Sequence, residues 1–339
     1  MRLGVALVGV LVVGQCFGKS SAVAVCQGSE FYTEFRYGPA KGLGYEEGMT
    51  RRDPSDIIKI GPRYYVWYTK TPHGSSGYNA TIWYATSADG RAWKEKGEAI
   101  ARGSQGAWDE HSVFTPNMLV AAGKYYLFYT AVPEPFTNDR GGPSGTKTAI
   151  GVAVAASPDG PWERCAHNPV LRPSQDRHDF DSHRVDDACL IVRDGKYWLY
   201  YKGRQLGLSP SQTKMGVAIA LKPEGPYAKS QLNPVIKSGH EVLVWPYREG
   251  VAALIGPTGP DKNTIQYSPD GLRFSVKAHI EDPPKAPGGY RPDAFTNTRY
   301  ASGFSWGISM GSYRKWPYLV RFECDLSLIH TKAEQTKRE

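Results

Sequence analysis

The aromatic stretch YYVWYT at residues 64–69 recurs as YYLFYT at 125–130 and as YWLYY at 197–201. Each copy is followed by a small-residue, alternating segment (82–86, 150–155, 215–220) and then by a turn: SADG at 87–90, SPDG at 157–160 or KPEG at 222–225. Two fainter copies cover 250–271, which ends in SPDG, and 303–323. A unit that recurs in fixed order is typical of propellers and solenoids. Five copies of about four strands each predict an all-β fold, a five-bladed β-propeller, with equivalent loops meeting at a central pocket.

The two ends of the chain differ from the repeats. Arg2, the apolar run at 3–13 and the small residues at 22–24 are typical of a secretory signal peptide. The apolar run is too short to span a bilayer. We expect a signal peptide (1–24), a lead segment (25–49), the propeller (50–327) and a polar C-terminal tail (328–339). The mature protein is expected to be periplasmic or secreted, with no membrane contact after signal cleavage.

Cysteine content and charge limit the classes of partner. Signal cleavage leaves four cysteines, which could form two disulfides in an exported protein: Cys26, Cys165, Cys189 and Cys324. A free thiol is the simpler interpretation for Cys189, in an apolar strand. Loss of Arg2 and Lys19 lowers the net charge from +8 to +6. This modest excess suits an acidic polysaccharide, whereas the scattered basic residues and the lack of a motif argue against nucleic acid.

A polar residue precedes a short apolar segment upstream of each aromatic strand. In a propeller that segment is the innermost strand, which lines the central channel. The aligned polar positions are Asp53, Thr115, Asp187, Asp293 and, in the less regular fourth copy, His240 with Glu241. The repeat therefore predicts that acids from four blades converge at one end of the channel.

Converging carboxyl groups are the minimum apparatus of glycoside hydrolysis, in which one group protonates the leaving oxygen and another activates water or attacks the sugar. A third carboxyl group shifts the pKa of its neighbours. A single Asp before Pro or Ala often only caps a turn, but several in equivalent positions favour catalysis. Arg52 and Arg184 either hold such carboxylates ionised and bind hydroxyl-rich or anionic ligands, or form structural pairs between blades.

Histidine and tryptophan supply further candidates. His240 can act as a general acid if a carboxylate raises its pKa, and Gly239 permits the irregular backbone that would turn both His240 and Glu241 toward the pocket. Trp108 and His111 lie in a segment that forms either a pocket wall or a solvated loop. No linear metal motif is present, although a divalent cation held by scattered ligands in the central channel would leave none.

Three stretches, 50–70, 108–131 and 180–204, resemble glycoside hydrolase family 117, and the similarity extends from about 41 to 325. That resemblance implies a five-bladed propeller and an exo-acting, inverting hydrolase that needs no cofactor for its chemistry. It implies Asp53 as the base, Asp187 as the second pocket acid, His240 as the general acid and Glu241 as its carboxylate neighbour. Asp186 is an alternative to Asp187. The substrate-binding candidates are Arg52, Trp108, His111, Thr115, His183, Arg184, Asp186 and Asp293.

The resemblance also implies a substrate, because characterised members of the family release 3,6-anhydro-L-galactose from neoagaro-oligosaccharides. Family members carry an N-terminal helical region exchanged between subunits, for which the segment at 25–49 is too short, so the oligomeric state stays open. Two alternatives stand beside this function. One is a family 43-like arabinofuranosidase or xylosidase, and the other is a propeller that binds carbohydrate without cleaving it.

Overall fold

The computed structural model describes residues 29–74, 79–135, 146–312 and 315–328. The predicted signal peptide (1–24), Cys26 and nearly all of the C-terminal tail lie outside these residues. The described chain forms strands β1 to β21 and one short 3₁₀ helix, η1 (Pro210–Gln212). No helix in these ranges is long and apolar enough to cross a membrane.

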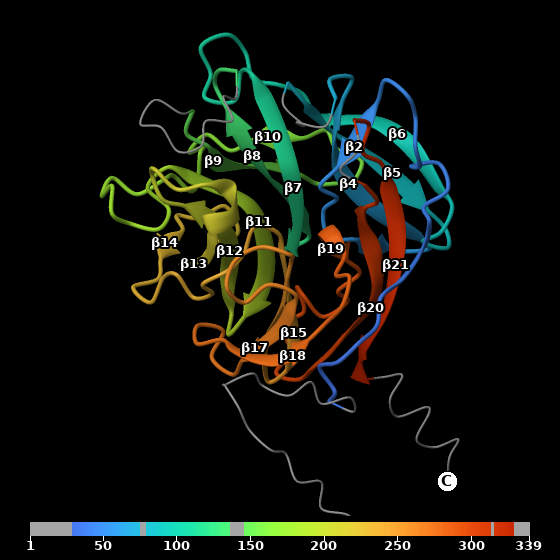
Figure 1. Ribbon diagram of the computed structural model, residues 1–339. Helices are drawn as coiled ribbons and strands as arrows, with labels where there is room; N and C mark the ends of the chain where they lie inside the picture. The colour runs from blue at the N-terminus through green and yellow to red at the C-terminus, as the bar shows by residue number, and fades with distance from the viewer. Residues whose placement is uncertain (1–28, 75–78, 136–145, 313–314, 329–339) are drawn as a thin grey trace, which may run out of the picture.

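The first three blades are separate antiparallel sheets (Figure 1). Blade one contains β2 (Thr50–Arg52), β3 (Ile58–Ile60), β4 (Arg63–Thr71), β5 (Thr81–Ser87) and β6 (Trp93–Ile100). Blade two contains β7 (Ser112–Ala121), β8 (Lys124–Val132), β9 (Ala149–Ala155) and β10 (Glu163–Arg164). Blade three contains β11 (Arg184–Arg193), β12 (Lys196–Arg204), β13 (Lys214–Ala220) and β14 (Ala228–Lys229). The three aromatic repeats form β4, β8 and β12, as the sequence predicts.

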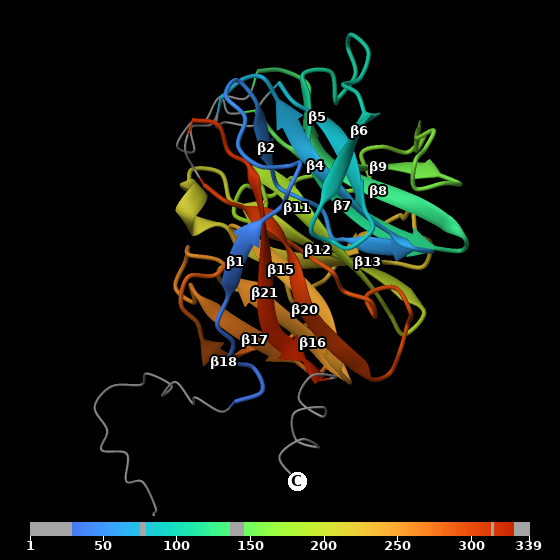
Figure 2. The same ribbon diagram turned by 90° about the vertical axis from the view of Figure 1, so that its right-hand side faces the viewer.

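The remaining strands form one eight-stranded sheet made of two four-stranded units. Blade four contains β15 (Val242–Arg248), β16 (Gly250–Ile255), β17 (Thr264–Ser268) and β18 (Ser275–His279). Blade five contains β19 (Lys285–Gly289), β20 (Ala301–Met310), β21 (Leu319–Ser327) and β1 (Arg36–Pro39). Among the described strands, the pairing of β15 with β20 joins the two units. Since β1 precedes blade one in the sequence but pairs with β21, it connects the segment before blade one to the last blade (Figure 2).

The apolar core lies between neighbouring blades. Trp67 of β4 and Tyr129 of β8 share one buried cluster, and Phe128 of β8 and Tyr201 of β12 share the next. A strand buried on both faces carries a nearly continuous apolar run. This explains why the aromatic repeats do not alternate with polar residues. The aromatic side chains packed between adjacent blades fix the angle between those blades, and thereby the position of the innermost strands.

A buried polar cluster joins all five blades at the centre of the ring. Asp56 of blade one forms an ion pair with Arg291, which follows β19, and both side chains are almost fully buried. Asp56 also accepts a hydrogen bond from Asn117 of blade two (2.9 Å). Arg291 donates to the carbonyl oxygens of Leu190 in blade three (2.9 Å) and Val244 in blade four.

This cluster bears on the predicted channel cation. The guanidinium of Arg291 supplies a positive charge at the centre of the channel, beside the Asp56 carboxylate. Within the described ranges no group of three or more His, Cys, Asp or Glu side chains is arranged to hold a metal ion. The residues present therefore do not fit a divalent cation in the channel.

Candidate active site

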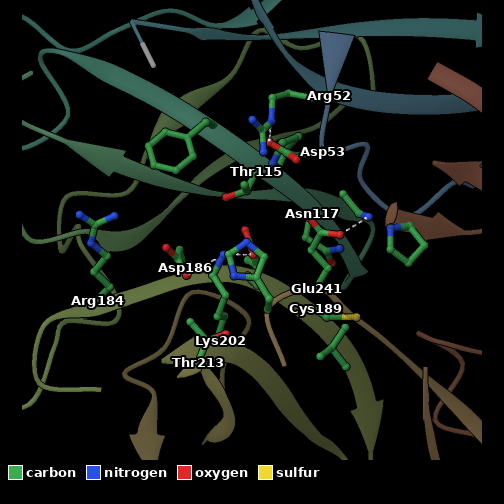
Figure 3. A pocket seen from close by; sticks show the side chains of 18 of the residues that line it. Arg52, Asp53, Thr115, Asn117, Arg184, Asp186, Cys189, Lys202, Thr213 and Glu241 are labelled. Atoms are coloured by element: carbon green, nitrogen blue, oxygen red, sulfur yellow. Dashed lines mark hydrogen bonds and ion pairs between the residues drawn. The ribbon is translucent and has the colours of Figure 1, made fainter. Parts of the chain in front are cut away.

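A cavity of about 260 Å³ opens beside the central cluster, and all five blades contribute to its wall. The residues that line it include Asp53, Thr115, Asp187, His240, Glu241 and Ala286. Figure 3 shows Arg52 and Asp53 on one side of the cavity, and Asp186 and Lys202 across from them. Residues far apart in the sequence, including Asp53, Asp187 and His240, thus share one small cavity.

The same backbone irregularity turns one side chain of each of four blades toward this cavity. In β7, β11 and β19 the pairing with the next strand is interrupted by a bulge. The first bulge residue has a positive φ: 45° at Thr115, 52° at Asp187 and 43° at Ala286. In blade one, Asp53 (φ 50°) occupies the break between β2 and β3. A non-glycine residue adopts this conformation at a cost, and a bulge re-aims the side chain that it carries.

The bulge corrects the prediction for blade five. The innermost strand there is β19, with Ala286 at the bulge, so blade five supplies no acid at this position. Asp293 follows β19 and does not line the cavity; its carboxylate accepts a hydrogen bond from the backbone of Ser302 (2.7 Å). Asp293 therefore does not occupy the position that the repeat predicts, because the alignment followed the Asp-Ala pair that it shares with Asp187. The better signal was a residue before proline: Asp53-Pro54, Thr115-Pro116 and Ala286-Pro287.

The bulge amides also link each blade to the preceding one. The amide of Thr115 donates to the hydroxyl of Thr69 in blade one (2.8 Å), and that of Asp187 donates to Thr130 in blade two (3.3 Å). The amide of Ala286 donates to the Glu241 carboxylate of blade four (2.8 Å). The backbone of blade five therefore orients the Glu241 carboxylate. The hydrogen bonds of the three bulge amides thus hold neighbouring blades together and also fix the geometry of the site.

Asp53 is the candidate base. Its Oδ2 lies 2.8 Å from the Nε of Arg52. Burial raises the pKa of Asp53; the charge of Arg52 acts in the opposite direction, and the carboxylates of Asp187 and Glu241 raise it further. A carboxylate with a raised pKa is a stronger base than an exposed aspartate, which is what activation of water requires.

The sequence leaves open whether Asp186 or Asp187 is the acid that faces the pocket. In the structure both residues line the cavity. Adjacent residues of a regular strand point to opposite faces, but the bulge after Asp186 interrupts that alternation. The Nζ of Lys202 lies 3.4 Å from Asp186 and also pairs with Asp187. Burial opposes the charge of Lys202, yet these two carboxylates raise its pKa above the usual value, so it stays an ammonium.

Lys202 was not predicted as a site residue, although the repeat contains a signal for it. In blades one to three, the residues that pair with the last position before the irregularity are Thr69, Thr130 and Lys202. Among these three blades, blade three thus carries a lysine where the other two carry a threonine. Comparing the ends of the aromatic strands would have identified it.

His240 and Glu241 both line the cavity immediately before β15, and Gly239 before them has a φ of 146°. The Nδ1 of His240 lies 2.9 Å from the carbonyl oxygen of Pro210 in η1. When Nδ1 donates this hydrogen bond, Nε2 is the nitrogen left for a ligand. Burial and, to a smaller extent, the charge of Lys202 lower the pKa of His240 to about 4, although Asp187 acts in the opposite direction.

The other predicted binding residues divide into two groups. Arg52, Thr115 and Arg184 line the cavity. Trp108, His111 and His183 do not: Trp108 stacks on Tyr129 with ring centroids 5.7 Å apart, and His183 is fully buried. Trp108 was predicted to bind substrate, but its ring packs within blade two and does not line the cavity. Cavity residues not predicted as site residues include Asn117, Lys202, Arg204 and Thr213.

The described cysteines form no disulfide: Cys165, Cys189 and Cys324 are free thiols. Cys189 lies in the cavity wall, with its Sγ 3.9 Å from the carboxylate of Asp56. Burial raises its pKa to about 12. The thiol is therefore neutral and unsuited to act as a nucleophile.

Known proteins share this fold. Residues 49–250 match the model of glycosyl hydrolases family 43. No curated protein matches the chain. Among solved structures, Zg3597, a family 117 glycoside hydrolase produced by the marine bacterium Zobellia galactanivorans, is 34% identical, with a TM-score of 0.79 over 88% of this chain and 92% of that chain. The α-L-arabinofuranosidase PaAbf62A of Podospora anserina, solved with cellotriose, is 12% identical, with a TM-score of 0.58 over 87% of this chain and 97% of that chain.

The similarity to the arabinofuranosidase concerns the fold alone. The similarity to the family 117 hydrolase, at 34% identity, extends over nearly the whole of both chains. The carboxylates that line the cavity and His240 lie within residues 49–250, the range that matches the family 43 model. The chain therefore belongs to glycoside hydrolase family 117 and is a glycoside hydrolase.

Proposed function

We propose that this protein is an exo-acting, inverting hydrolase that removes a terminal α-linked 3,6-anhydro-L-galactose, or a related sugar, from algal galactan oligosaccharides. The observation that carries the proposal is the shared cavity of Asp53, Asp187 and His240. The substrate follows from the family resemblance, and the reaction from the residues in the cavity.

Asp53 acts as the general base. It accepts a proton from a water molecule that attacks the anomeric carbon, while Arg52 holds the carboxylate in place. Inverting hydrolysis needs space for that water, with acid and base groups roughly 6.5–9.5 Å apart. Nuclear magnetic resonance of the first product formed tests the stereochemistry, since inversion of an α-linkage releases the β-anomer.

His240 acts as the general acid, through Nε2, toward the departing oxygen. The lowered pKa means that His240 is a neutral imidazole at pH 7 in the free enzyme. The imidazole therefore takes up the proton that it later donates to the departing oxygen when the substrate binds. The neighbouring carboxylates of Asp186 and Asp187 favour that proton. We therefore expect kcat/KM to be highest on the acidic side of neutrality, because the protonated fraction of the acid falls as the pH rises.

The size of the cavity supports exo action. Its volume of about 260 Å³ lies below the roughly 300–1,000 Å³ of common ligand pockets. Asp56, Asn117 and Arg291 block the channel beside it. Such a cavity admits one terminal sugar, and the rest of the oligosaccharide extends into solvent.

The decisive experiment is product analysis on neoagaro-, neocarrageenan and arabinoxylan oligosaccharides. Release of a single anhydro-sugar from the first panel supports the proposal. Release of arabinose or xylose instead supports the second candidate, a family 43-like arabinofuranosidase or xylosidase, which the family 43 match over residues 49–250 favours.

We also propose that the enzyme is exported, on the evidence of the signal-like segment at 1–24. The proposal predicts a mature N-terminus close to residue 25 in protein recovered from the periplasm or the medium. Recovery of the uncleaved chain from the cytoplasm alone would contradict it.

A further inference from the structure

Lys202 brings a buried positive charge into the wall of the cavity. It lies on β12, and only 13% of its side-chain surface is accessible. Its ammonium pairs with the carboxylates of Asp186 (3.4 Å) and Asp187. Figure 3 shows Lys202 beside Asp186, across the cavity from Asp53. A charge removed from water is costly unless acceptors replace the lost hydration, so its place at the cavity points to a role there.

The equivalent position holds a threonine in blades one and two. The hydroxyls of Thr69 and Thr130 accept hydrogen bonds from the bulge amides of the blades that follow them, at 2.8 Å and 3.3 Å. Lys202 cannot take over this role, because an ammonium group donates hydrogen bonds and accepts none. The junction between blades therefore does not explain the lysine, whereas the cavity that it lines does.

The pair of Lys202 and Asp187 has hydrogen-bonding capacity that a ligand can use. An ammonium group has three N–H donors, and within the described ranges the carboxylates paired with Lys202 are those of Asp186 and Asp187. The ion pair engages Oδ2 of Asp187, which leaves Oδ1 as an acceptor. Since both residues line the cavity, a donor and an acceptor stand side by side at its surface.

We propose that Lys202 and Asp187 together bind one hydroxyl group of the sugar in the cavity, and that Lys202 thereby helps to select that sugar. The ammonium donates to the hydroxyl oxygen, and the hydroxyl donates to Oδ1 of Asp187. A hydroxyl group is both donor and acceptor, so the pair satisfies it completely. Charged partners strengthen both bonds, and burial limits competition from water. The inference rests on the proposed function and adds a specificity residue to it.

An alternative role for Lys202 is purely electrostatic. Burial opposes its charge, but the carboxylates of Asp186, Asp187 and Glu241 raise its pKa. Burial and the charge of Lys202 in turn lower the pKa of His240. If this effect were the whole role of Lys202, its loss would weaken the binding of a sugar and of the same sugar without one hydroxyl by equal factors. Sugars that lack a single hydroxyl therefore separate the two roles.

The first experiment measures binding without turnover. Calorimetric titration of the Asp53→Asn variant compares methyl 3,6-anhydro-α-L-galactopyranoside with its 2-deoxy and 4-deoxy analogues. At least one analogue should bind about 10- to 100-fold more weakly than the parent, the range of a hydrogen bond to a charged group. After Lys202→Met in the same background, that analogue and the parent should bind within about threefold of each other. Equal binding of all three sugars to Asp53→Asn, or an undiminished difference after Lys202→Met, overturns the inference.

Lys229→Met in the same background is the matched control. Lys229 lies in the same blade and pairs with the buried Asp181 (2.6 Å) outside the cavity, so its loss should leave the difference between the sugars unchanged. Thermal unfolding verifies that each variant folds. A measurement on Asp53→Asn alone decides the inference if Lys202→Met does not fold: the nitrogen resonance of the Lys202 ammonium should shift with the parent sugar and less with the deoxy analogue. Equal shifts with both sugars contradict the proposed contact.

The second experiment measures turnover of neoagaro-oligosaccharides as a function of pH. Lys202→Met should lower the maximum of the kcat/KM profile about 10- to 100-fold, because the lost contact weakens binding in every protonation state of the site. An electrostatic role alone moves the profile along the pH axis and leaves its maximum unchanged. That second result would overturn the inference.

The proposed function and this inference fail separately. If neoagaro-oligosaccharides are cleaved but every deoxy analogue binds as tightly as the parent, the proposed function stands and the hydroxyl contact is wrong. If arabinoxylan is cleaved instead, the proposed sugar is wrong, and the same titrations with methyl α-L-arabinofuranoside or methyl β-D-xylopyranoside and their deoxy analogues decide the role of Lys202. If none of the three parent glycosides binds, the inference is overturned, and product analysis still decides the proposed function.

Discussion

The Nε atom of Arg52 lies 2.8 Å from the Oδ2 atom of Asp53, so the candidate base has its counter-charge in the preceding residue. Neither side chain is freely exposed, with 20% and 12% of the side-chain surface accessible. The pair is therefore held at the cavity edge, where it orients one carboxylate oxygen and leaves the other for water.

Asp53→Asn should lower kcat about 10²- to 10⁴-fold, the usual contribution of a general base. The amide is nearly isosteric, and asparagine tolerates a positive φ, so the fold should be retained. Rates of sugar release and circular dichroism provide the test. Asp194→Asn is the matched control, because that aspartate also has a positive φ (51°) but is 74% exposed in the β11–β12 turn. Unchanged turnover in Asp53→Asn would falsify the assignment.

Lys202→Met should raise the pKa of His240, since the buried ammonium is one of the groups that lower it. Nuclear magnetic resonance of the imidazole, titrated in the free enzyme, measures this directly and needs no substrate. Lys229→Met is the matched control: Lys229 pairs with Asp181 (2.6 Å) outside the cavity and should leave His240 unchanged. An identical midpoint in Lys202→Met and the wild type contradicts the electrostatic role.

His240 should make the fold sensitive to acid. Its pKa is about 4 in the folded chain but about 6.5 when unfolded. Between these values the unfolded state binds the proton and the folded state does not. Stability is therefore full above about pH 6.5 and falls as the pH drops to 4, by up to about 3 kcal/mol.

His240→Gln tests this pH dependence, because the variant lacks the titrating group. Urea unfolding at pH 7 and pH 4.5 should show a smaller loss for His240→Gln than for the wild type. His178→Gln, at an exposed position, should follow the wild type. Equal losses in all three proteins would show that His240 is not the acid-sensitive group.

Asp56→Asn or Arg291→Met should destabilise the fold by about 3–5 kcal/mol, because each leaves a buried partner without its counter-charge. The exposed pair of Arg36 and Asp325 provides the comparison, and Arg36→Met should cost at most about 1 kcal/mol. Urea unfolding measures both. A loss below 1 kcal/mol for either central variant would mean that the cluster does not hold the blades together.

Much of the fold could be predicted, because the information is local and repeated. The aromatic stretches at 64–69, 125–130 and 197–201 become β4, β8 and β12. The failure at Asp293 has a physical cause: the bulge of blade five carries Ala286, whose side chain has no polar group to reveal it. Where the bulge residue of a repeat is not an acid, the sequence of that repeat no longer indicates which residue faces the cavity.

The candidate site was predictable where chemistry and repeat position coincide, as for Asp53, Asp187 and His240, which share the cavity. Lys202 and Arg204 stand at the end of an aromatic strand and become visible only through their pairing with Asp186 and Arg184. Trp108 illustrates the reverse case, since an aromatic residue in a polar segment packs inside its own blade.

The order of residues by itself determined that this chain forms aromatic blades with acids at their inner ends, because strand patterns and turns are encoded within a few neighbouring positions. Only the tertiary structure decided which side chains meet. Ring closure by β1 and the bulges of the inner strands bring blades together across hundreds of residues. Charge and burial at the shared cavity then set the proton affinities, and these depend on distances that no linear pattern contains.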